Sequence, residues 1–85
     1  MSKGKKNINA RVLNYTVLFE PAQEGGYIVH VPALPGCHTQ GETLDEAYRM
    51  AQDAIYGCLK TLQSLQEAIP QESESSIIAK IPVKL

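Results

Sequence analysis

The stretch that decides the fold is EGGYIVHVPALPGCHTQGETLDEAYRMAQDAI, residues 24–55. Residues 27–31 alternate Tyr, Val and Val with Ile and His, the period of two that indicates a β-strand. In the LPGC segment, residues 34–37, proline presets φ at the second position and glycine supplies the positive φ that a type II turn requires at the third. The chain therefore reverses, and residues 37–41 are predicted to form another short strand.

One long amphipathic helix is predicted after that strand. Thr43 and Glu46 form a T-x-x-E capping box. Apolar positions then recur at steps of three and four, at Leu44, Ala47, Ala51, Ala54, Cys58, Leu62 and Leu65. A stripe of this width suits a helix that lies across a sheet. The periodicity fades near Ile69, and Pro70 followed by QESESS predicts a polar connection.

Two more strands flank these elements. YTVLFE, residues 15–20, alternates at the strand period, and the loop at 21–26 joins it to the next strand as a hairpin. IIAKIPV, residues 77–83, alternates again; Pro82 cannot donate a ladder hydrogen bond, which favours a sheet edge. The sequence thus predicts an α+β fold in the order β-β-β-α-β: an antiparallel meander plus a fourth strand, with one long helix packed on one face of the sheet.

The length of 85 residues allows one domain, which we place at 14–85 after a basic, flexible arm at 1–13. A chain this short buries only about 60% of its unfolded surface, which favours a homo-oligomer. A single helix covers one side of the sheet, and Leu18, Ile28 and Ile78 are out of phase with that side. We expect a partner or a second copy to cover them, in a dimer or tetramer; alternatively, they are isolated exposed side chains.

Charge and cysteine content bear on partners and compartment. The formal net charge is −1. The only charges before Glu20 are basic: Lys3, Lys5, Lys6 and Arg11. Such an arm is either a solvated terminus or a weak nucleic-acid contact. The two cysteines make no C-x-x-C pair, and no apolar run has the length of a membrane span or signal peptide, so we predict a cytoplasmic location and no membrane association.

The residues capable of chemistry form no convincing site. Cys37 and His38 are neighbours on a strand and point to opposite faces, so they do not readily join His30 around one ion. No spacing selects a base for Cys37 as a nucleophile. Asp45 and Glu46 fall in the first helical turn, where they offset the helix dipole. We therefore predict no catalytic residue, no metal and no cofactor, and we do not expect an enzyme.

YTVLFE, the stretch at 24–55 and the AIP segment before the last strand together resemble the HicB-type antitoxin domain over residues 14–83. The most diagnostic pieces, in order and spacing, are Gly26-Tyr27, Val31-Pro32, Leu34-Pro35-Gly36-Cys37, Thr39, Gly41 and Glu46-Ala47. The resemblance implies a degenerate ribonuclease H-like fold without nuclease activity. It also implies a domain that binds and neutralises a small, mRNA-cleaving HicA-type toxin and that forms dimers or higher oligomers.

Our hypothesis is that the toxin is bound by the sheet edge, the helix surface and the proline-stiffened loop formed by Leu34, Pro35, Gly36, Cys37 and His38. Many members of the family carry a C-terminal DNA-binding domain as well. The chain stops at Leu85 without a recognition helix, so we do not expect DNA binding by that route; either this is a stand-alone domain or the sequence is a truncated piece of a longer protein. Two alternatives stay open: a stand-alone regulatory or scaffold protein with a different partner, and weak nucleic-acid binding through the basic arm.

Overall fold

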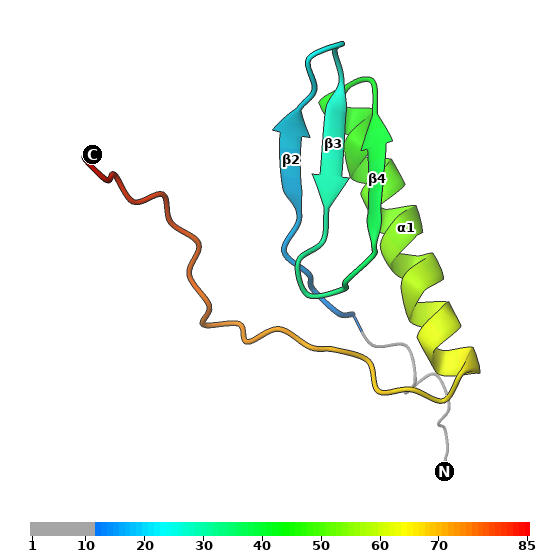
Figure 1. The fold of residues 1–85 in the computed structure, drawn as a ribbon. Helices are drawn as coiled ribbons and strands as arrows, with labels where there is room; N and C mark the ends of the chain where they lie inside the picture. The colour runs from blue at the N-terminus through cyan, green and yellow to red at the C-terminus, as the bar shows by residue number, and fades with distance from the viewer. Residues whose placement is uncertain (1–11) are drawn as a thin grey trace.

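The computed structural model describes residues 12–85. In chain order it contains the strands β2 (Leu18–Pro21), β3 (Tyr27–His30) and β4 (His38–Gly41), followed by the helix α1 (Leu44–Ser64). The three strands form an antiparallel sheet in the order β2-β3-β4, and α1 lies along one face of it (Figure 1). The predicted α+β class, the meander and the single long helix are confirmed.

Glycine makes both turns of the meander possible. In the β2–β3 loop, Gly26 has a φ of 76°, and a Cβ built on it would lie 2.6 Å from the carbonyl oxygen of Gly41. In the connection from β3 to β4, the amide of Cys37 donates to the carbonyl oxygen of Leu34 at 2.9 Å. Gly36 has a φ of 83°, so this turn has the bond and the positive φ expected from its LPGC sequence.

The helix begins at the predicted cap. The hydroxyl oxygen of Thr43 accepts a hydrogen bond from the Glu46 amide at 3.1 Å. The Glu46 carboxylate accepts in return from the amide of Glu42 at 2.5 Å, one residue earlier than in the ideal capping box. Two backbone donors at the start of the helix are thereby satisfied by side chains.

The helix ends at Ser64, several residues before Pro70. Gln66 adopts a φ of 58°, and its amide donates to the Gln63 carbonyl oxygen at 3.0 Å. The amide of Glu67 donates to the carbonyl oxygen of Leu62 at 2.9 Å. This pair of bonds is a Schellman motif, so backbone geometry at Gln66 ends the helix and proline does not.

The core lies between the sheet and α1 and consists of two groups of buried side chains. One contains Val29, Ala47 and Ala51; the other contains Val31, Leu34 and Cys37, packed against the later turns of the helix. Small residues set the spacing, because a Cβ on Gly41 would lie 2.4 Å from the backbone nitrogen of Ala47. The first turns of α1 therefore sit directly against the end of β4.

The predicted fourth strand is absent from the described residues. Tyr15 Oη donates to the Pro70 carbonyl oxygen at 2.5 Å, and Thr16 donates to Glu72 through both its amide and its hydroxyl. These bonds hold the chain at the base of β2, and beyond them it runs away from the sheet (Figure 1). We call residues 77–85 the tail. Because of it, the radius of gyration is 16.3 Å, against about 12 Å for a compact chain of this length.

Candidate partner-binding surfaces

The loop between β3 and β4 presents only part of the predicted toxin contact. Leu34 and Cys37 are each 3% exposed and belong to the core, where they pack against α1. Pro35, Gly36 and His38 are exposed. The sequence pattern grouped all five because they are consecutive, whereas the turn sends two of them inward. A contact made by this loop therefore has to use Pro35, Gly36 and His38.

The Cys37 thiol is poorly suited to nucleophilic chemistry. Burial, and secondarily its contact with the Cys58 thiol, raises the pKa of Cys37 to about 12, so the thiol stays protonated at neutral pH. Both cysteines are free, and Cys58 is half-buried in the same cluster. His38 is exposed on the opposite side of the strand, as the alternation predicted. Cys37 and Cys58 therefore contribute to the packing of the core.

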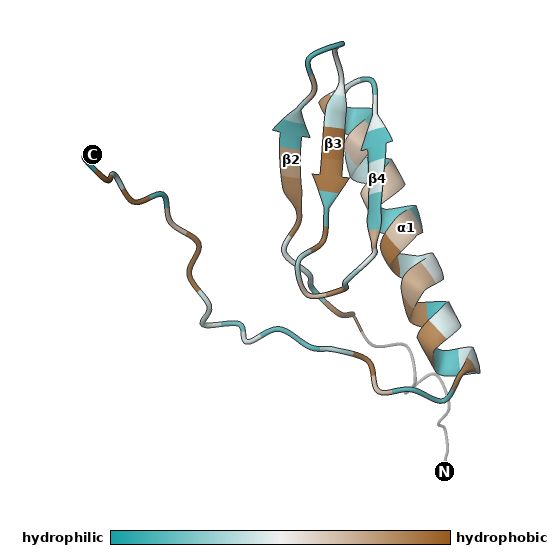
Figure 2. Ribbon diagram, viewed as in Figure 1, coloured by the Kyte–Doolittle hydropathy of each residue, from teal (hydrophilic) through white to brown (hydrophobic). Residues whose placement is uncertain are grey.

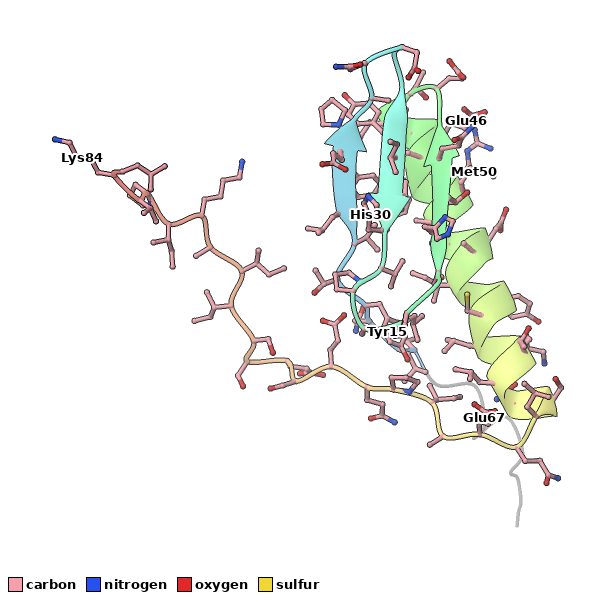
Figure 3. All side chains as sticks on the ribbon, viewed as in Figure 1. Tyr15, His30, Glu46, Met50, Glu67 and Lys84 are labelled. Atoms are coloured by element: carbon pink, nitrogen blue, oxygen red, sulfur yellow. The ribbon has the colours of Figure 1, made fainter. Side chains whose placement is uncertain are left out.

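The face of the sheet opposite α1 is open and of mixed character. Leu18 and Ile28 lie on it, 44% and 38% exposed, as predicted from their phase. His30 is paired in register with His38, and its Nε2 lies 3.2 Å from Glu20 Oε1 (Figure 3). The side chains of Glu20, His30 and His38 are all well exposed, so the contact between His30 and Glu20 contributes little to stability. The face is a candidate docking surface.

A groove runs between the free side of β2 and α1. It encloses about 540 Å³ and is lined by Val12, Leu13, Asn14, Tyr15, Val17, Phe19, Tyr48, Ala51, Gln52 and Ile55. It exists because α1 packs chiefly against β4 and less against β3, so the helix-facing side chains of β2 are only partly covered. The sequence pattern assigned Ala51 to the apolar stripe of the helix but did not identify the groove, since the groove depends on where the helix crosses the sheet.

Acidic side chains gather where the β2–β3 loop meets the start of α1. Glu24, Glu42 and Glu46 line a second open pocket of about 490 Å³, together with Met50. Figure 3 shows Glu46 at this end of α1 and Glu67 at the other. All nine acidic residues lie within the described part of the chain, against four of the eight basic ones. Sequence reasoning missed this acidic end, because Glu24 and Glu42 are brought together only by strand pairing.

The remaining predicted residues contribute no site in the described part. Lys3, Lys5, Lys6 and Arg11 lie outside residues 12–85. Within that range, no group of three or more His, Cys, Asp or Glu side chains is arranged to hold a metal ion. No helix of the described chain is both long and apolar enough to cross a membrane.

These observations define the class first: a small α+β protein with a three-stranded antiparallel sheet, one long helix and several open surfaces. The sequence profile described as HicB_like antitoxin of bacterial toxin-antitoxin system matches residues 15–82. The chain therefore belongs to the HicB-like antitoxin family, as its motifs indicated.

Individual relatives agree with this assignment. A UPF0150 protein of Thermoplasma acidophilum is 40% identical over 65 residues, which cover 76% of this chain and 94% of that protein. Antitoxin HicB of Escherichia coli K12 is 39% identical over 61 residues, covering 72% of this chain. Antitoxin HicB 1 of Photorhabdus laumondii is 41% identical over 58 residues, covering 68%. The matched regions make up 44% and 37% of these two antitoxins, so the chain is similar to less than half of each.

Proposed function

We propose that this protein is a non-catalytic antitoxin that binds a small HicA-type toxin in the cytoplasm and prevents it from cleaving messenger RNA. The observation that carries the proposal is the family match over residues 15–82, which spans the whole sheet and helix. Inhibition by this domain requires only a complementary surface over the toxin's RNA-binding site. It needs no nucleophile, and the Cys37 thiol, whose pKa is raised by burial, is not required to act as one.

Electrostatics supports a basic, RNA-binding partner. A protein that grips RNA presents Lys and Arg to the phosphates, and an acidic surface both attracts it and competes with its substrate. The acidic end of this domain, formed by Glu24, Glu42 and Glu46, has that character. Exposed charges of this kind mainly raise the association rate and make binding sensitive to salt.

The loop between β3 and β4 is the second part of the proposed contact. Pro35, Gly36 and His38 are exposed beside a turn fixed by the Cys37–Leu34 backbone bond. The loop joins the ends of β3 and β4 remote from the β2–β3 loop, so the two surfaces lie at opposite ends of the sheet (Figure 1). They can therefore be tested separately.

The experiment is an RNA cleavage assay with a purified HicA-type toxin and the full chain added in increasing amounts. We expect cleavage to stop near equimolar protein and to return as salt is raised. Persistent cleavage at a large excess of the chain would contradict the proposed function. A tagged chain purified from its native cells, with mass spectrometry of the bound proteins, identifies the toxin or a different partner.

Charge-reversing variants then assign the contact. Glu24→Lys with Glu42→Lys alters the acidic end, and Pro35→Arg with His38→Arg alters the loop. Glu67→Lys, at the far end of α1, is the matched control (Figure 3). Loss of inhibition with the first pair assigns the acidic end, and loss with the second pair assigns the loop; far-ultraviolet circular dichroism checks that each variant is folded.

A further inference from the structure

The tail has the sequence of a strand, and within residues 12–85 it pairs with no other strand. Its apolar side chains are strongly exposed: Ile77 is 89%, Ile81 78% and Val83 79% exposed. Figure 2 shows apolar stretches recurring along this segment, which runs away from the sheet beyond Ile78; Ile78 itself lines an open pocket with Leu18 and Pro32. An extended, alternating apolar segment in water is unfavourable, because burial of such side chains against another surface releases free energy.

The sheet offers a matching vacant position along β2. Among residues 12–85, β2 is the first strand in the order β2-β3-β4 and pairs on one side only, so within that range its other side presents unpaired backbone donors and acceptors. Beside it, on the helix side, lies the groove lined by Val17, Phe19, Tyr48, Ala51 and Ile55. A further strand in this position would complete the backbone ladder and also fill the groove.

The two faces of the tail fit the two faces of β2. Ile77, Ala79, Ile81 and Val83 share one face, which is wholly apolar and suits the groove. The opposite face carries Ile78, Lys80, Pro82 and Lys84, and the opposite face of β2 carries Leu18 and Glu20. Opposite charges on neighbouring strands of one face are favourable. Pro82 is tolerated because the added strand would itself become the edge.

We propose that the tail of one copy adds as a fourth strand beside β2 of a second copy, with the groove receiving Ile77, Ile81 and Val83. The bonds from Tyr15 and Thr16 fix residues 70–72 at the base of each copy's own β2, and the chain then leaves that sheet. The nine residues of the tail span ~30 Å when extended, enough to reach a neighbouring molecule. In a twofold dimer each copy gives one tail and receives one.

This arrangement also accounts for the predicted but missing strand. The strand pattern of residues 77–83 is genuine, and its partner is supplied by a second chain. The proposal does not depend on the toxin, because the exchange concerns copies of this chain alone.

The test is a crosslink between two differently tagged full-length chains. One carries Glu20→Cys and the other Lys80→Cys, both in a Cys58→Ala background; Cys37 is retained because it is buried. After mixing under conditions that allow exchange, a short bismaleimide should join the two tags into a mixed dimer. A Glu67→Cys chain mixed with the Lys80→Cys chain is the control. It should crosslink far less, because Glu67 lies at the C-terminal end of α1 and is not part of the proposed contact between the tail and β2 (Figure 3).

Sedimentation provides the second measurement. The unaltered chain should sediment as a concentration-dependent dimer, Ile81→Asp should be monomeric with an unchanged circular dichroism spectrum, and Lys80→Gln should stay dimeric. Three outcomes would overturn the proposal: a monomer at all concentrations, a dimer that survives Ile81→Asp, or crosslinking only within single chains that carry both Glu20→Cys and Lys80→Cys. The last result would show that the tail folds back on its own β2.

Discussion

Replacement of Gly41 by alanine tests how closely the helix is seated on the sheet. The added Cβ would lie 2.4 Å from the nitrogen and 2.6 Å from the Cα of Ala47. Both are backbone atoms of the first helical turns, so the clash can be relieved only by moving α1 or β4. Overpacking of this kind costs about 1–3 kcal/mol, and we expect the upper end, about 3 kcal/mol, because no flexible side chain can yield.

A loss of that size is a large part of the total stability, because a chain of this length has an unfolding free energy of roughly 4–13 kcal/mol. Gly57→Ala is the matched control: Gly57 lies within α1, and a Cβ there meets nothing within 4 Å. It should stabilise the protein by about 0.5–1 kcal/mol through helix propensity. Urea unfolding followed by circular dichroism measures both. A Gly41→Ala variant within ~0.5 kcal/mol of the parent would refute the close seating of the helix.

Three further predictions concern stability. Thr43→Ala removes the side chain that accepts from the Glu46 amide and should cost about 1 kcal/mol in urea unfolding; an unchanged midpoint would contradict the capping role. Leu34→Ala should lower the free energy of unfolding by about 2–5 kcal/mol, because Leu34 is buried. A loss as small as that expected for an exposed side chain would place Leu34 outside the core. Because the pKa of Cys37 is raised to about 12 in the folded state, the unfolded chain loses this proton first as the pH rises. Its contribution to stability is complete below about pH 9 and is lost as the pH rises toward 12; pH-dependent unfolding of Cys37→Ala should lack this component, and an identical alkaline profile would count against it.

Local sequence signals predicted most of the fold because their physics is local. Gly36 is needed for the turn whatever surrounds it, and Thr43 with Glu46 marks the helix start through bonds between near neighbours. The helix end was harder to predict. Gln66 takes up a left-handed conformation with no glycine to signal it, so periodicity alone extended the helix toward Ile69.

The partner of a strand, by contrast, is not encoded in its alternation. Residues 77–83 have the period of a strand, yet in the described chain they pair with no other strand. Pairing depends on the direction that the chain takes after Glu72, which is held beside Thr16. The candidate loop shows a related limit. Its five consecutive residues were predicted as one surface, and the turn geometry buries Leu34 and Cys37 while it exposes the others.

The missing side chains of Gly26 and Gly41 also affect how the acidic end can act. Gly26 lies against Gly41, and Gly41 lies against Ala47, so loop, strand and helix meet mainly through backbone atoms, with the methyl group of Ala47 as the nearest side chain. A close contact between backbone segments has few alternative arrangements, and Glu24 and Glu42 belong to the segments that make this contact. A partner that docks there would meet charges already preorganised, and would lose little conformational entropy in ordering the backbone beneath them.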